Sequence, residues 1–132
     1  MDSRERTFLA LEHQAGDRIP TCGSVLKLVP DFIECGMDVL QSIQPDAAGM
    51  RLSNLKAQFG DRLCFHGGVS IQQTMPFGSP DKVRQAVKKI AAVVKPDGGY
   101  IFCTAHNIQA DTSVENVLAL LEAYHRYGRH DQ

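Results

Sequence analysis

Apolar and polar residues follow one another in a repeated order along the chain: a short apolar stretch, a polar tip and then an amphipathic segment. The clearest copy starts at residue 99, where a Gly-Gly turn precedes an apolar run that gives way to polar residues at 104–109. Earlier copies start near residues 21, 38 and 63. This order predicts four strands separated by helices, and hence parallel pairing with right-handed crossovers.

Parallel strands that are joined by helices place all of their carboxyl-terminal ends on one rim of the sheet. The predicted strands cover 21–24, 38–44, 63–66 and 100–103. We therefore expect the polar tips of the four strands to converge. These tips are Cys22-Gly23-Ser24, Gln44, His66-Gly67-Gly68 and His106-Asn107-Ile108-Gln109.

Apolar residues at helical spacing, with capping residues at the segment ends, predict five helices. They are the segment 3–15 before Gly16, then Leu26 to Gly36, Leu52 to Gly60, Ser79 to Pro96, and Thr112 to Gly128. The stretch around Pro76 and Gly78 is predicted to be a loop.

The last helix has a capping box in its sequence, because Thr112 is followed three residues later by Glu115. Its predicted buried face consists of Val114, Val117, Leu118, Leu121 and Tyr124. We treat the chain as one domain, with 1–18 as N-terminal helix and lead-in, 19–128 as four strand-helix units and 129–132 as a tail.

Composition narrows the class of protein. The chain has 132 residues, about half of the roughly 250 that a complete (β/α)8 barrel needs. A formal charge of -1 gives no basic field for nucleic acid or an anionic membrane. No apolar signal-peptide core or bilayer-spanning stretch is present, and the four cysteines are scattered singly. We expect reduced thiols and a cytoplasmic protein without nucleic-acid or membrane partners.

The residues also resemble a known family. The opening SRERTFLALEHQAGDRIP is similar to the start of members of the uroporphyrinogen decarboxylase superfamily, which includes the cobamide-dependent methyltransferases. TCGS, DVLQSIQPDAAGM, LKAQFGDRLCFHGGVSIQ, GSPDKVRQAV and GGYIFCTAHNIQADTSVENVLALLEAY resemble the C-terminal portion of that family, in the same order. The resemblance implies a (β/α)8 barrel, of which this chain would form half.

One long segment of the family has no counterpart here. In the family it separates the parts that resemble DRIP and TCGS, and here those parts are fused. By resemblance, that segment holds the first half of the barrel, with the substrate-gripping arginines and the essential aspartate of the decarboxylase. The late histidine of the decarboxylase does match His106. In the methyltransferase branch a zinc ion is held by a His-x-Cys motif and a later Cys. Here the Cys of the motif corresponds to Cys22, whereas Pro20 stands in place of its His and His106 stands in place of the later Cys.

The candidate ligand-binding residues lie at the predicted strand tips. They are His106, Asn107, Gln109, His66, Gly67, Gly68 and Gln44. His106 could donate a hydrogen bond to a carboxylate, or with Cys22 and a third donor it could hold zinc. The glycines at 67 and 68 could let backbone amides approach an anion, or could serve only a tight turn. We expect no cofactor, with zinc on Cys22 and His106 as the alternative.

A half-barrel leaves one face of its parallel sheet uncovered, which such sheets rarely tolerate. Val39, Ile43, Phe65, Ile101 and Cys103, or their strand neighbours, are expected on that face. Either the N-terminal helix covers it or two chains associate to rebuild a barrel, and we favour a homodimer. In that case Phe65→Asp should give insoluble or monomeric protein.

Three functions are compatible with these features. The first is a uroporphyrinogen decarboxylase-like protein that binds a carboxylate-rich or tetrapyrrole-like small molecule, with weak or no turnover because the catalytic segment is missing. The second is a zinc-dependent methyltransferase-like protein. The third is a non-catalytic truncated remnant or binding module. Whether the chain is an enzyme, a carbon–carbon lyase by resemblance, stays open.

Overall fold

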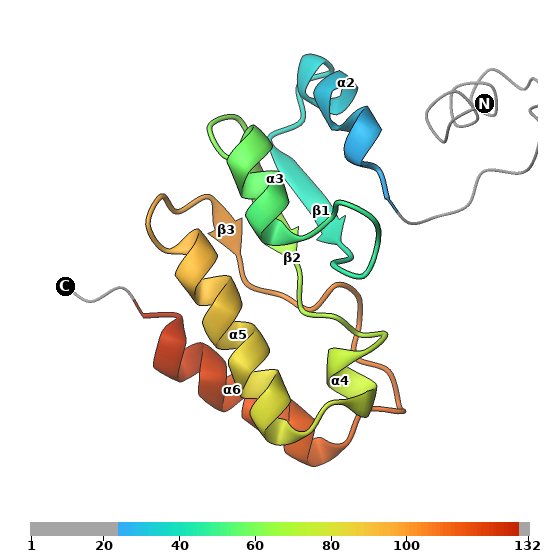
Figure 1. Ribbon diagram of the computed structural model, residues 1–132, viewed down its shortest axis with the longest axis vertical. Coiled ribbons are helices and arrows are strands. Elements are labelled where there is room, and N and C mark those ends of the chain that lie inside the picture. The colour runs from blue at the N-terminus through green and yellow to red at the C-terminus, as the bar shows by residue number, and fades with distance from the viewer. Residues whose placement is uncertain (1–23, 130–132) are drawn as a thin grey trace, which may run out of the picture.

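A computed structural model describes residues 24–129 (Figure 1). The elements, in chain order, are the 3-10 helix η1 (Leu26–Leu28), α2 (Val29–Glu34), β1 (Val39–Ile43), α3 (Leu52–Phe59), β2 (Cys64–Gly67), α4 (Thr74–Phe77), α5 (Pro80–Val94), β3 (Tyr100–Ile101) and α6 (Val114–Tyr127). The predicted helix at 3–15 and residues 21–23 of the first predicted strand lie outside this part of the chain.

The described strands form a three-stranded parallel sheet in the order β1-β2-β3. Each strand is followed by a helix, which confirms the predicted α/β class and matches part of a barrel wall. The predicted second, third and fourth strands correspond to β1, β2 and β3. The first predicted strand, 21–24, lies almost entirely outside the described residues, so the first of the four predicted strand-helix units stays a prediction.

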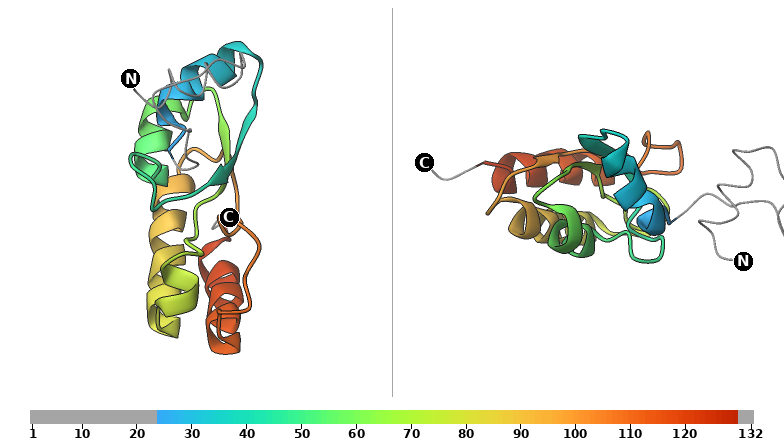
Figure 2. Two further views of the ribbon diagram at one scale, coloured as in Figure 1. Left: turned by 90° about the vertical axis from the view of Figure 1, so that its right-hand side faces the viewer. Right: turned by 90° about the horizontal axis from the view of Figure 1, so that it is seen from above.

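One face of the sheet packs against helices. Leu40, Phe65 and Tyr100 are register partners across the three strands, so their side chains lie on the same face. They belong to one apolar cluster with residues such as Leu55 of α3 and Val94 of α5. Both helices accordingly lie on this side of the sheet (Figures 1 and 2). Burial of this row is what fixes the orientation of the strands.

The opposite side of the sheet, here named the inner face, carries Val39, Cys64, His66 and Ile101. Val39 pairs with Cys64 and His66 pairs with Ile101 in the strand register. Val39 is 40% exposed and Ile101 is 48% exposed, while Cys64 and His66 are half-buried. The prediction of an open, partly apolar sheet face is confirmed at Val39 and Ile101.

Two residues expected on that open face lie in the core instead. Ile43 and Phe65 are both fully buried. The strand register shifts between Leu40 and Ile43, and this irregularity brings Ile43 into the same core as Leu40. Phe65 lies at one of the alternate positions of β2 whose side chains face the helices. The proposed Phe65→Asp test was therefore wrongly placed, because it would disrupt the core rather than an interface.

The predicted ends of α3 and α5 are confirmed. Gly60 follows the last residue of α3. Ser79 precedes α5, and its side chain accepts a hydrogen bond from the Lys82 amide at 3.3 Å. The segment around Pro76, predicted to be a loop, forms the single turn of α4, because Met75 packs fully buried against α5 and α6.

The prediction for α6 was wrong in its cap and in its buried face. Ser113, rather than Thr112, accepts the hydrogen bond from the Asn116 amide. The residues turned into the core are Asn116, Ala119, Leu120 and Ala123. The alanines let α6 approach α5 closely, which leaves most of the larger apolar residues outside. Val114, Leu118, Leu121 and Tyr124, here named the α6 stripe, are 70%, 53%, 50% and 42% exposed.

Within residues 24–129, no helix combines the length and the apolar character needed to cross a membrane.

Candidate functional site

The ends of the three strands meet, as the sequence predicts. The Gly68 amide donates to the Ile43 carbonyl at 3.0 Å, and the Ala105 amide donates to the Val69 carbonyl at 2.8 Å. Val69 and Thr104 also form a parallel bridge beyond β2 and β3. The Ser42 hydroxyl donates to the Ala105 carbonyl. These bonds place the tip of β1, the tip of β2 and the segment 104–105 side by side on one rim.

The two glycines of the β2 tip serve this close packing. Gly67 has φ +108° and Gly68 has φ +103°, conformations that side chains rarely adopt. A Cβ on Gly67 would lie 2.9 Å from the Ile43 amide nitrogen. Both glycines are buried, and the Gly68 amide is already used by Ile43. This geometry fits a tight turn; the Gly68 amide is not available to an anion.

His66 lies on the inner face, one residue before this turn. Its Nδ1 atom is buried and has no hydrogen-bond partner among the described residues. Leaving such an atom unsatisfied costs about 1–3 kcal/mol, so buried nitrogens of this kind are nearly always paired with protein, water or ligand. His66 is therefore the predicted site residue with a buried polar atom that no other described residue satisfies.

The other predicted residues are arranged differently. Gln44 donates through Nε2 to the Asp46 carboxylate at 2.8 Å and so belongs to a loop contact. His106 is exposed, and its carbonyl accepts from the Thr104 hydroxyl at 2.6 Å. Asn107 and Gln109 are also exposed, and the Gln109 Nε2 atom donates to the Asn107 carbonyl at 2.9 Å. The imidazole of His106 next to the rim remains open to solvent.

Of the two predicted zinc ligands, only His106 is among the residues that the structure describes. Cys22 lies outside the described residues, so its distance to His106 is not tested. Within residues 24–129 no three His, Cys, Asp or Glu side chains converge as a metal site would need. The Cys22–His106 pair stays a prediction. Cys35, Cys64 and Cys103 form no disulfide with one another.

Tyr100 is a structural part of the rim that the sequence pattern did not single out. Its hydroxyl donates to the Gly67 carbonyl at 2.6 Å and so ties β3 to the end of β2. Burial raises the pKa of Tyr100, because the buried site disfavours the phenolate. Tyrosine is common in strands, so its presence in a strand sequence gave no signal of this contact.

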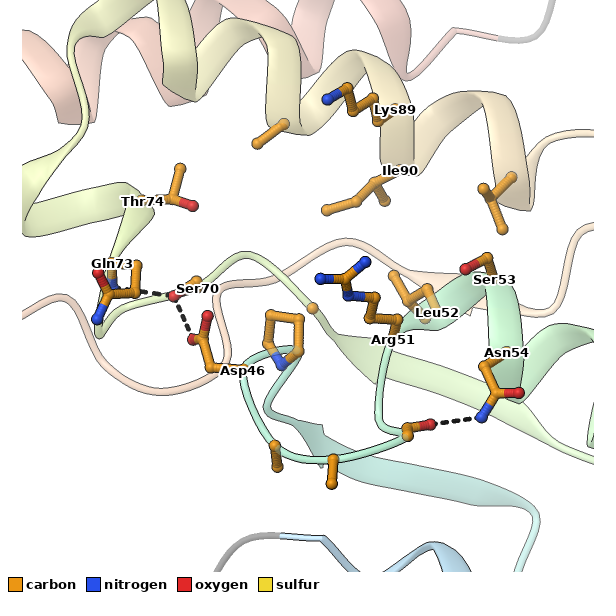
Figure 3. A pocket seen from close by; sticks show the side chains of 17 residues that line it. Asp46, Arg51, Leu52, Ser53, Asn54, Ser70, Gln73, Thr74, Lys89 and Ile90 are labelled. Atoms are coloured by element: carbon orange, nitrogen blue, oxygen red, sulfur yellow. Dashed lines mark hydrogen bonds between the residues drawn. The ribbon is translucent and has the colours of Figure 1, made fainter.

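A groove of about 950 Å³ opens on the other side of the same strand ends (Figure 3). Its walls are the loop after β1, the start of α3, the loop after β2 and the side of α5. Asp46, Arg51, Ser70, Thr74, Lys89 and Ile90 are among the residues that line it. Gly68 is the one predicted site residue in its lining. Neither Arg51 nor Lys89 is among the residues that the sequence analysis predicts to bind a ligand.

A family model and several known proteins that are similar to this chain share one description. The family model described as "Uroporphyrinogen decarboxylase (URO-D)" matches residues 7–127. A protein of that name from Pseudoalteromonas atlantica is 30% identical over 76 residues, which are 58% of this chain and 21% of the relative. One from Mannheimia succiniciproducens is 26% identical over 97 residues, 70% of this chain and 27% of the relative. One from Chromohalobacter salexigens is 31% identical over 84 residues, 61% of this chain and 23% of the relative. The chain thus spans about a quarter of the length of these relatives.

Proposed function

The chain belongs to the uroporphyrinogen decarboxylase family, and from this premise we propose that it binds a carboxylate-rich, tetrapyrrole-like small molecule on the inner face of its sheet. The observation that carries the proposal is the buried Nδ1 of His66, which has no partner among residues 24–129. A ligand carboxylate, or a water that bridges to one, would supply the missing hydrogen bond.

The surroundings of His66 suit a flat, partly apolar ligand. Ile101 lies beside it in the strand register, and Val39 lies on the same face of β1. Both side chains are more than a third exposed. Apolar contact with these side chains would stabilise a ring system, while His66 and the exposed His106 would interact with its carboxylates.

We expect decarboxylation by this chain to be weak or absent. Loss of carboxylate from a pyrrole acetate requires the protonated pyrrole to be stabilised. By resemblance, that role belongs to an aspartate in the family segment that has no counterpart between DRIP and TCGS here. An assay with uroporphyrinogen that gives ordinary decarboxylase rates would overturn this part of the proposal.

Binding can be measured with uroporphyrin, the oxidised and fluorescent form of the ligand class. We expect the fluorescence titration to saturate, and His66→Gln to weaken binding about tenfold, the effect of 1.4 kcal/mol. His125→Gln is the matched control, because His125 lies on α6 against the Tyr124 ring. A titration in which the two variants bind equally well, with circular dichroism showing both folded, would contradict the role of His66.

We also propose that two copies of the chain associate through β3 and the α6 stripe. β3 is an edge strand of the described sheet, Ile101 and the α6 stripe are exposed apolar side chains, and Tyr124 of the stripe stacks on Phe102, which directly follows β3. The family fold is a closed barrel, in which β3 would have a further strand beside it. A second copy would supply apolar cover for this edge.

A further inference from the structure

We propose that the groove between α3 and α5 binds a phosphate group, either as inorganic phosphate or as part of a phosphorylated small molecule. The groove lies on the helix side of the sheet, so it is separate from the inner face and from the uroporphyrin site proposed there. Five features of the groove lead to this inference: its two cations, its one hydrogen-bonded carboxylate, the uncapped start of α3, its hydroxyl groups and its size.

Two cationic side chains lie on opposite walls. Arg51 immediately precedes α3, and Lys89 lies on α5. Figure 3 shows the Arg51 side chain extending from the start of α3 toward α5, with Lys89 on the helix beyond it. Among the described residues the recorded ion pairs are made by Arg62 and Arg84, and neither Arg51 nor Lys89 takes part in them. Their charges therefore remain available to an anion.

Asp46 is the only acid among the described residues that line the groove, and its carboxylate already accepts hydrogen bonds. Asp46 accepts through one carboxylate oxygen from both Gln44 Nε2 and the Ser70 hydroxyl. The bond from Ser70 joins the loop after β2 to the loop after β1 and holds one end of the groove in place (Figure 3). With two cations and one hydrogen-bonded carboxylate, the lining has a net positive formal charge.

The start of α3 adds backbone donors to the same wall. No side chain among residues 24–129 caps this helix, and Arg51 occupies the cap position in an extended conformation. The Asn54 amide donates to the Arg51 carbonyl at 3.0 Å, so the Leu52 and Ser53 amides are the donors left at the positive end of the helix dipole, where an anion is favoured. Asn54 is not the missing cap, because its Nδ2 atom donates to the Gly49 carbonyl at 2.6 Å and shapes the preceding loop.

Hydroxyl groups and open space complete the site. Ser53 of α3 and Thr74 of α4 both line the groove, and neither hydroxyl makes a hydrogen bond to another residue in the described part of the chain. A guanidinium, an ammonium and several neutral donors around one space suit the multiple oxygens of a phosphate better than a single carboxylate. The volume of about 950 Å³ and the apolar wall at Ile90 leave room for an attached organic group.

The test is a calorimetric titration of the full chain with inorganic phosphate, pyrophosphate and ribose 5-phosphate. Arg51→Gln and Lys89→Gln should each weaken binding about tenfold. Lys88→Gln is the matched control, because it removes the same charge from the same helix but lies near the Tyr127 ring, 5.9 Å from its centroid, and does not line the groove. We expect the control to bind as the unaltered chain does.

The three probes distinguish the sources of the phosphate. Equal affinity for inorganic phosphate and ribose 5-phosphate would identify free phosphate as the ligand, whereas tighter binding of the ester would identify a phosphorylated metabolite. No saturable binding of any probe, or equal weakening by all three variants, would overturn the proposal. Uroporphyrin titration of Arg51→Gln keeps the two sites apart, because that variant should retain full affinity for uroporphyrin.

Discussion

The Tyr100 hydroxyl donates a hydrogen bond to the carbonyl of Gly67, the last residue of β2, at 2.6 Å. The bond joins β3, which is only two residues long, to the tip of β2. It also satisfies a carbonyl at a turn where Gly67 and Gly68 both have positive φ. The rim geometry next to His66 therefore depends on a contact that comes from a different strand.

Tyr100→Phe removes this bond while keeping the ring. We expect the free energy of unfolding to fall by about 1 kcal/mol, the net value of one hydrogen bond. Chemical denaturation at neutral pH measures this. Unchanged stability would mean that the bond is not formed in solution.

The same residue should give the protein a dependence on alkaline pH. The unfolded chain ionises Tyr100 near its ordinary pKa of about 10, and burial raises the pKa in the folded chain. Between the two values the folded chain binds more protons, so the free energy of unfolding falls as pH rises above about 10. Denaturation across this range should show a steeper loss for the unaltered chain than for Tyr100→Phe. Identical slopes would contradict the pKa shift.

Gly67→Ala tests the closeness of the strand ends. The substitution forces a side chain into φ +108° and places its Cβ 2.9 Å from a backbone nitrogen of Ile43. We expect a loss of about 3 kcal/mol or more. Gly98→Ala is the control, since Gly98 also has positive φ but has nothing within 4 Å of an added Cβ. It should cost about 1 kcal/mol, the backbone strain alone. Equal losses would refute the close approach.

Asn116 links α6 to the loop around α4. Its Nδ2 atom donates to the Met75 carbonyl at 2.8 Å and to the Gly78 carbonyl at 2.7 Å. Asn116→Ala leaves both carbonyls without this partner, so we expect a loss of about 2–3 kcal/mol in urea denaturation. The exposed Asn107 provides the comparison, and Asn107→Ala should change stability by less than about 0.5 kcal/mol. Similar losses for both would show that the Asn116 contacts contribute little.

The proposed association is tested by substituting the α6 stripe rather than the core. Leu118 is 53% exposed, so Leu118→Asp should leave the fold intact and shift the solution mass from about twice 14.5 kDa to 14.5 kDa. Light scattering over a range of concentrations measures the mass. Phe65→Asp serves as the contrast, because it buries a charge in the core and should unfold the chain. A persistent monomer of the unaltered chain would rule out the dimer.

The succession of strands and helices along the chain and the ends of the helices were predictable because they depend on local signals. Ser79 before Pro80, and Gly60 after an apolar stripe, specify helix ends within a few residues of sequence. The convergence of the strand tips followed from parallel topology alone. The face of Ile43 did not, because the register shift before it depends on pairing with β2, which no local pattern records.

The face of α6 was mispredicted for a different reason. Its sequence has apolar residues on two sides, and hydrophobicity alone favoured the side with larger residues. The structure buries Ala119 and Ala123 against α5 because small side chains permit close helix packing. The groove was also missed, since Arg51 and Lys89 are far apart in sequence and line one groove only because α3 packs beside α5.

Ligand binding to the inner face of the sheet can be tested by mapping amide chemical shifts of the labelled full chain during a titration with uroporphyrin. We expect the largest shifts at Val39, Cys64, His66 and Ile101, with little change at Leu55 and Val87, which face the helical cores. Shifts confined to the α3–α5 groove or to the outer side of α6, or no shifts at all, would contradict it.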